Sequence, residues 1–290
     1  NIQFITLNVP AGDKHRNLRQ IRQVCEKIVS ENYDVRTIIA LGNNTILNIA
    51  GFISRIWHSP VNLILIPATL LAQTSSVHDI SARLNVGNIP NQLMIDTRPN
   101  LVWIDIGLLK SLNESDILSG IAAVLQYCAI DTHGFINVFQ SYVQRILNME
   151  MDAVEEFMTE YHGHRVRHFK KSGEGIYRLG SRIVQIIKQQ SVASPLNDGK
   201  TQLLGIHIEL CLARKSELLS EQDFEALMRI LKQIPLEVSI SDDEKKKLIQ
   251  TLKEEHMLRH FYLLKTPGEF EHAEHLEENL IMDALNFTCQ

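Results

Sequence analysis

With 290 residues, 44% of them hydrophobic, the chain can bury one large core or two smaller ones. A net charge of -5 gives no general attraction to nucleic acid or to an anionic membrane. The apolar runs are far shorter than the roughly 20 residues that a membrane-spanning helix needs, and no signal peptide opens the sequence. We therefore expect a cytoplasmic protein. Its cysteines lack CxxC spacing and are expected to be reduced: Cys25, Cys128, Cys211 and Cys289.

The first third of the chain has the pattern of an α/β layer. Alternation predicts a strand over residues 1–9, which a turn at 10–13 ends, and apolar residues at helical spacing predict a helix over 18–28. An apolar run at 37–41 then meets Gly42 and two asparagines, and helical spacing resumes at once. A second apolar run at 63–67 is typical of a buried parallel strand after a crossover helix.

The turn after residue 41 is the most informative position of this layer. In a strand, turn and helix unit, the free N–H groups and the dipole of the helix N-terminus favour a phosphate. Any ligand of the first domain is therefore expected near Gly42.

From about Glu114 the pattern becomes helical. Apolar stripes at 117–128, 157–164, 183–187 and 227–231 predict an all-helical domain, with a candidate late strand at 261–264 and a closing helix from Ala273 to Leu285. We place the boundary at residue 112, with helix-capping residues at 113–116, so that the domains span 1–112 and 113–290. The charge run at 242–247 is interpreted as a solvated first helical turn.

Several motifs resemble those of the dehydroquinate synthase family of sugar-phosphate cyclases. Residues 66–73 read IPATLLAQ against the family's IPTTLLAQ, and residues 41–52 read LGNNTILNIAGF against LGGGVVGDLAGF. The P-x-x-V-x-I-D strand recurs at 99–105, and SGIAAVLQYC at 119–128 corresponds to AGLAEVIKYA. The resemblance implies a Rossmann-like domain with a parallel sheet, followed by a helical domain.

The resemblance also implies where NAD would bind. The family positions are occupied here by Gly42, Asn43, Asn44, Asn48, Thr69, Asn91 and Ser111. Glycine lets the backbone approach a pyrophosphate, and two of the three glycines of the turn have become Asn43 and Asn44. Because asparagine tolerates left-handed φ, the turn itself is expected to persist. NAD binding is not expected.

The divalent metal of the family, usually zinc, is not expected either. The resemblance places its three ligands at Ala123, Ser181 and Asp198, and a lysine of the family at Gln126. Zinc needs nitrogen, sulfur or carboxylate donors, typically three from the protein. A single carboxylate is not such a site.

Other groups of reactive side chains have simpler interpretations. His162, His164 and His168 lie close in sequence, as do His256 with His260 and His272 with His275, but none supplies three donors and a cleft. Ser75, Ser76 and His78 lack both a GxSxG turn and an orienting acid, so a nucleophilic triad is not indicated.

Two function hypotheses remain open. The first is a dehydroquinate synthase-like protein that has lost its NAD- and metal-dependent activity. It would bind a small molecule in the interdomain cleft or another chain, as a homodimer or as a heterodimer with a related cyclase. The second is an active carbon-oxygen lyase of the 3-dehydroquinate synthase type with a rebuilt site. A metal-dependent alcohol or glycerol phosphate dehydrogenase is a weaker third reading, because the PATLLAQ segment favours the cyclases.

Overall fold

The structure is a computed structural model. It describes residues 3–79, 81–87, 89–168, 179–190, 196–236, 238, 240–254, 261–273 and 276–288. The chain divides into two compact units, Asn1–Ser111 and Leu112–Gln290. Each unit is described by itself.

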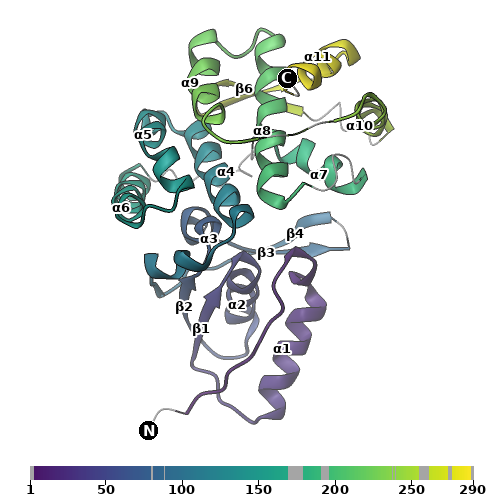
Figure 1. The fold of residues 1–290 in the computed structure, drawn as a ribbon. Coiled ribbons are helices and arrows are strands. Elements are labelled where there is room, and N and C mark those ends of the chain that lie inside the picture. The colour runs from purple at the N-terminus through teal and green to yellow at the C-terminus, as the bar shows by residue number, and fades with distance from the viewer. Residues whose placement is uncertain are drawn as a thin grey trace. The chain divides into compact units, whose positions relative to one another are not determined.

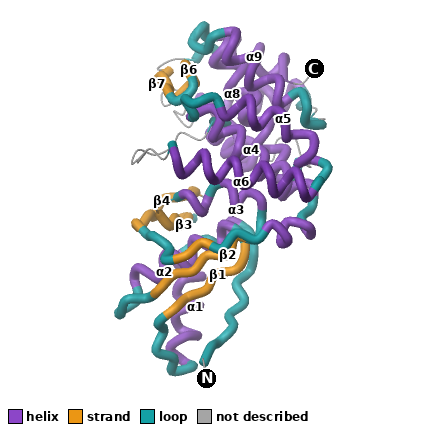
Figure 2. The backbone as a smooth tube through the Cα atoms, turned by 90° about the vertical axis from the view of Figure 1, so that its left-hand side faces the viewer, coloured by secondary structure: helices purple, strands orange, loops and turns teal. Residues whose placement is uncertain are grey.

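A three-stranded parallel sheet organises the first unit. Its strands β1 (Thr37–Gly42), β2 (Asn62–Pro67) and β5 (Leu101–Val102) lie in the order β1-β2-β5, and Figure 2 shows β1 and β2 side by side. Helix α2 (Asn44–Ile56) connects β1 to β2 and covers one face of the sheet. The core between them consists of Ala40, Leu47, Ala50, Leu63, Leu65 and Ala72. The predicted strand, helix and parallel strand are confirmed.

The opposite face of this sheet is apolar but open in the described structure. Its outward side chains include Ile39 and Leu41 of β1, together with Leu101 and Trp103 at the end of β5; their exposed fractions are 63%, 55%, 47% and 61%. The prediction of a fully buried β2 is therefore wrong, because Ile64 and Ile66 alternate with the buried Leu63 and Leu65. Alternation arises because successive side chains of a strand point to opposite faces.

The N-terminal segment does not form the predicted strand. Residues 3–9 pair with no strand, and the Phe4 side chain is 77% exposed. An alternating pattern gives a strand only where a partner completes its hydrogen bonds. The predicted helix is confirmed as α1 (Leu18–Ser30), which Asn17 caps by accepting a hydrogen bond from the Gln20 N–H at 3.0 Å.

The rest of the first unit consists of short elements. Beyond β2 come α3 (Leu70–Thr74) and the antiparallel pair β3 (Ser81–Val86) and β4 (Ile89–Asp96). Short 3-10 helices lie before α1, η1 (Asp13–His15), and after α3 and β5, η2 (Ser76–His78) and η3 (Ile106–Ser111). Gln73 is fully buried, and its amide donates to the carbonyls of Pro67 at 3.1 Å and Asp105 at 3.0 Å. The Gln73 side chain thus links the end of β2 to the segment after β5, and the two carbonyls are 38 residues apart in sequence (105 minus 67).

The second unit is mainly helical, and α8 runs through its middle (Figure 1). Both α4 and α8 are buried along most of their length and pack against each other. The helices are α4 (Glu114–Ile130), α5 (Phe135–Leu147), α6 (Met151–Arg167), α7 (Ser181–Gln190), α8 (Asp198–Lys215), α9 (Glu221–Leu231), α10 (Asp242–Glu254) and α11 (Glu278–Thr288). The predicted stripes at 117–128, 157–164, 183–187 and 227–231 all lie on these helices, and Asn113 caps α4 as expected.

Three details of the second unit differ from the sequence prediction. The candidate strand at 261–264 is part of a hairpin, β6 (Phe261–Thr266) with β7 (Glu269–Ala273), so the domain is mainly rather than wholly helical. Consequently Ala273 belongs to a strand, and the closing helix begins only at Glu278. The charge run does open α10, but Lys245 is buried, and its ammonium donates to Asn286 Oδ1 at 2.9 Å.

Two glycines allow α7 and α8 to cross closely. Gly180, immediately before α7, has a φ of 85°, and a Cβ on Gly205 of α8 would lie 2.6 Å from the Gly180 carbonyl oxygen. A side chain at either position would push the two helices apart. This crossing fixes Ser181, the first residue of α7, next to the middle of α8.

Candidate functional site

The turn between β1 and α2 has kept the shape that the sequence predicts. Gly42 ends β1 with a φ of 154°, and a Cβ there would lie 3.2 Å from the Ile46 Cβ. Its carbonyl accepts a hydrogen bond from the Ala68 N–H at 2.9 Å, which ties the turn to the end of β2. The carboxyl ends of β1 and β2, and with them Gly42 to Asn44 and Thr69, thus meet at one edge of the sheet.

Asn43 occupies the hydrogen-bond donors at the start of α2. Its Oδ1 accepts from the N–H groups of Thr45 at 3.2 Å and Ile46 at 3.4 Å. These are the free N–H groups that a helix N-terminus would otherwise offer to a phosphate. The turn is present, but not through left-handed φ. Asn43 has a φ of -83° and is an ordinary N-cap, and Asn44 is helical.

A substitution tests the assignment of Asn43 as a cap. Asn43→Ala removes the acceptor, and we expect the free energy of unfolding to fall by about 1 kcal/mol, as for other N-caps. Asn43→Asp keeps the acceptor and is expected to be within about 0.5 kcal/mol of the wild type. Urea unfolding of the three proteins measures both differences. Equal losses in both variants would show that the side-chain oxygen does not cap α2.

Asn44 and Asn48 serve the protein's own framework. The Asn48 amide donates to the Asn44 carbonyl at 2.7 Å, and its Oδ1 accepts from the Arg83 N–H at 2.7 Å. Asn48 therefore links α2 to β3 with both ends of its side chain. The Asn44 Oδ1 is buried without a hydrogen-bond partner.

The other three predicted cofactor positions lie on separate elements and have local roles. Thr69 caps α3 through the Ala72 N–H at 3.2 Å, and the Ser111 hydroxyl donates to the Leu108 carbonyl at 3.3 Å in η3. Asn91 lies on β4 with a φ of 58°, and its N–H donates to Asn85 Oδ1 at 3.0 Å. The structure thus gathers four of the seven predicted positions at the end of the sheet, while Asn48, Asn91 and Ser111 lie elsewhere in the unit.

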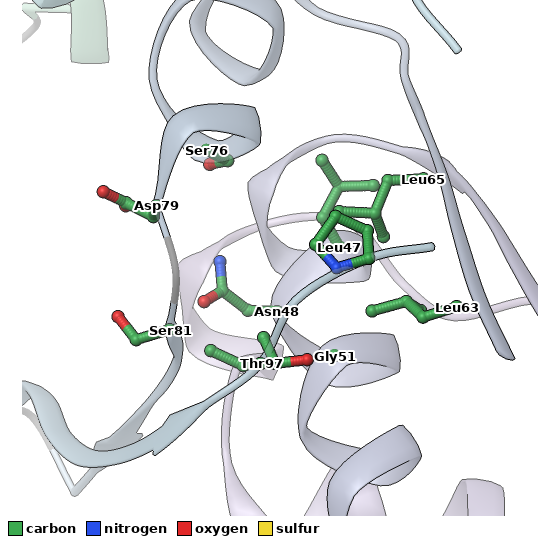
Figure 3. Close-up of a pocket in the computed structure, with 11 residues that line it drawn as sticks. Leu47, Asn48, Gly51, Leu63, Leu65, Ser76, Asp79, Ser81 and Thr97 are labelled. Atoms are coloured by element: carbon green, nitrogen blue, oxygen red, sulfur yellow. The ribbon is translucent and has the colours of Figure 1, made fainter. Parts of the chain in front are cut away.

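A small cavity lies beside α2 in the first unit (Figure 3). In this view the Asn48 amide points among Ser76, Asp79 and Ser81, and Thr97 lies next to Gly51. The cavity has a volume of about 20 Å³, which is room for one water molecule and not for a dinucleotide. Thr97, 7% exposed, has a buried hydroxyl without a protein partner that such a water would satisfy.

The three metal positions lie in the second unit, on α4, α7 and α8. Ala123 is buried in α4 and offers no donor, and Ser181 is exposed at the start of α7. Asp198 opens α8, and its Oδ1 lies 2.7 Å from the Lys188 ammonium. Gln126, at the family's lysine position, donates to the Leu179 carbonyl at 2.8 Å. Within the parts of the chain that the structure describes, no group of three His, Cys, Asp or Glu residues is placed to hold a metal ion.

Sequence reasoning missed two charged side chains in this region. Lys188 lies seven residues after Ser181, which places both on one face of α7, so helical spacing could have revealed it. Glu209 is the only charged residue in the apolar stretch 203–213 of α8, and it is 3% exposed. It accepts a hydrogen bond from the Gly180 N–H at 2.5 Å and others from the backbone of Arg182 and Ile183. Burial raises the Glu209 pKa to about 8, although these bonds oppose the shift.

Of the remaining predicted groups, some lie outside the described residues: His256, His260, His275 and Cys289. The described cysteines, Cys25, Cys128 and Cys211, are not joined in disulfides. Among the described helices, none is both long and apolar enough to cross a membrane.

Comparison with known proteins agrees with the fold and the motifs. Residues 6–119 match the model of the 3-dehydroquinate synthase N-terminal domain. The 3-dehydroquinate synthase of Desulforamulus reducens is 26% identical over 234 residues, which are 79% of this chain and 65% of that enzyme. In sequence the chain is similar to 3-dehydroquinate synthases, and its residues 6–119 match the N-terminal domain of that family.

Solved structures of sugar-phosphate cyclases share the fold of this chain over almost its whole length. A 2-deoxy-scyllo-inosose synthase complexed with carbaglucose-6-phosphate, NAD+ and Co2+ has a TM-score of 0.75 and 18% identity, with 96% of this chain and 81% of that chain covered. The 2-epi-5-epi-valiolone synthase ValA of Streptomyces hygroscopicus subsp. jinggangensis, with NAD+ and Zn2+ bound, has a TM-score of 0.71 and 16% identity, with the same coverage. At these identities the likeness concerns the fold alone.

Proposed function

We propose that this dehydroquinate synthase-like protein has lost NAD- and metal-dependent cyclase activity and acts by binding a ligand or a partner chain. The observation that carries the proposal is the state of the three metal positions. Ala123, buried in α4, offers only a methyl group, and Ser181 offers a hydroxyl. The Asp198 carboxylate is paired with Lys188 at 2.7 Å. Three protein donors with an open fourth position, which catalytic zinc requires, do not fit these residues.

The cofactor turn supports the same proposal. The two N–H groups that would hold a pyrophosphate already donate to the Asn43 side chain, and a dinucleotide would have to displace it. At two of the family's other cofactor positions, Thr69 and Asn48, the side chains make hydrogen bonds within the protein. NAD therefore does not fit this turn.

Direct binding measurements test the loss of both groups. We expect elemental analysis of the purified chain to find no stoichiometric zinc or cobalt, and calorimetry with NAD+ to give a dissociation constant above about 1 mM. The D. reducens synthase, treated in parallel, is the positive control. Stoichiometric metal, micromolar NAD+ affinity or turnover of a sugar phosphate would overturn the proposal in favour of an active cyclase with a rebuilt site.

For the binding role, the proposed partner is a second cyclase-like chain, either another copy of this one or an active relative. Because the described residues include no group of three donors placed to hold a metal ion, we propose binding, rather than chemistry, as the use of the retained fold. Size-exclusion chromatography with light scattering distinguishes a homodimer from a monomer. Co-purification with a related synthase from the same cells would identify a heterodimer.

A further inference from the structure

Two imidazole rings lie near one buried carboxylate in the second unit, and a third ring packs against both of them. We call this group the histidine corner and define it by Tyr127, Asp131, His133, His164 and His168. The rings of His133 and His168 are stacked, with centroids 3.8 Å apart and planes at 28°. His164 lies 4.5 Å from His168 and 6.2 Å from His133, again between ring centroids.

Asp131 connects the end of α4 to the start of α5. Its side chain is 2% exposed, and Oδ2 accepts from the N–H groups of His133 at 3.0 Å and Phe135 at 2.9 Å. The other oxygen, Oδ1, accepts from the Tyr127 hydroxyl at 3.4 Å, and lies 3.6 Å from His133 Nδ1 and 3.7 Å from His164 Nε2. His164 Nδ1 is in turn 2.8 Å from the Tyr127 oxygen. One carboxylate oxygen is thus shared among three side chains.

The charges around the corner can balance one imidazolium and not more. The Asp131 carboxylate favours the protonated form of His164. Arg167 and the rings of His133 and His168 disfavour that form. Arg165 lies over the Tyr127 ring at 4.5 Å and adds a further positive charge. Two other neighbours of this group carry no charge. His164 contacts the Phe135 ring of α5, and Tyr127 is next to the neutral Cys128 thiol of α4. Two imidazolium rings at stacking distance repel each other in such surroundings.

We propose that the histidine corner is a pH-sensitive contact that holds the last turn of α6 against the α4–α5 connection. With neutral rings the stack is closed. Charged rings at this stacking distance repel each other, and that repulsion opens the stack. His168 caps α6, its N–H donating to the His164 carbonyl at 3.0 Å, so opening of the stack frees that turn.

The direction of the effect follows from His164. Burial lowers the His164 pKa, with Asp131 opposing the shift and the neighbouring cations adding to it. A group of this kind takes up its proton more readily in the unfolded chain, so its contribution to stability is complete above pH 6.5 and declines as the pH falls below that value. Acidification therefore weakens the corner.

Thermal unfolding at pH 7.5 and pH 5.0 tests the proposal. We compare the wild type with His133→Asn/His168→Asn, which removes the two outer rings and leaves Asp131, Tyr127 and His164 in place. We expect the change in Tm from pH 7.5 to pH 5.0, whatever its sign in the wild type, to be more favourable in the double variant by roughly 4 °C or more. His58→Asn, in the first unit, is the matched control and should behave as the wild type.

A local measurement distinguishes a pH-sensitive contact from a merely structural one. Amide hydrogen exchange of residues 161–168 is expected to accelerate at least tenfold more than that of α9 on going from pH 7.5 to 5.0, after correction for intrinsic rates. This acceleration should be clearly smaller in the double variant, which keeps His164 but lacks the stacked pair. An equal pH dependence of Tm and of exchange in wild type and double variant would overturn the proposal.

Discussion

Restoring three side chains is expected to create a zinc site. Ala123→Glu, Ser181→His and Asp198→His together supply one carboxylate and two imidazoles, a donor set that zinc binds with its fourth position open. We expect the triple variant to bind one Zn²⁺ with a dissociation constant of roughly a micromolar or tighter, whereas the wild type binds none. Calorimetry with zinc, followed by elemental analysis after dialysis, measures the difference.

Two further variants make this experiment decisive. Replacing Ala123 by Gln in place of Glu keeps the size and removes the charged donor, so its affinity should be at least tenfold weaker. Adding Lys188→Met removes a cation that lies 2.7 Å from the present carboxylate at 198 and should tighten binding. If the triple variant binds no zinc while it remains folded, at least one of the three positions has been assigned wrongly.

Stability is expected to fall as the pH rises from 5 to 9 because of Glu209. Its pKa is raised from 4.5 to about 8, so the folded chain holds a proton that the unfolded chain releases. Such a contribution is complete below pH 4.5 and is lost progressively up to about pH 8. A shift of this size corresponds to an upper bound on the order of 5 kcal/mol.

Glu209→Gln isolates this effect. Glutamine keeps an oxygen that can accept from the Gly180 N–H and cannot ionise, so we expect most of the pH dependence to disappear. Guanidinium unfolding at pH 5.5 and pH 8.5 provides the free energies, and Glu155→Gln, an exposed position of α6, is the control. A wild-type slope that survives in Glu209→Gln would mean that the carboxylate is ionised in the native state at both pH values.

The elements of this fold that sequence predicts well are those with strong local signals. The apolar run before Gly42 and the helical spacing after it predict β1 and α2, and Asn113 with the acids that follow predicts the start of α4. The strand predicted at the N-terminus failed because alternation carries no information about a partner strand. The hairpin β6–β7 was seen only in part, since its second strand, EFEHA, is polar in sequence.

The candidate site was harder to predict than the fold. A resemblance gives the positions of Asn43, Asn48 and Gln126, but not what their side chains contact. Asn43 caps a helix, Asn48 bonds to strand β3, and Gln126 bonds to a carbonyl 53 residues away. The histidine corner illustrates the same limit, because His133 and His168 are 35 residues apart and are stacked only after α5 and α6 have packed (168 minus 133). Long-range polar contacts of this kind leave no periodic trace in the sequence.

The open side of the β1-β2-β5 sheet has a practical consequence. A patch that carries Ile39, Leu41, Leu101 and Trp103 will adhere to other apolar surfaces, more strongly as sulfate or phosphate salts are added. The solubility of this chain is therefore expected to be lower than its net charge of -5 suggests. The indole of Trp103, 61% exposed, reports on this directly, since its emission will shift to shorter wavelength whenever the patch is covered.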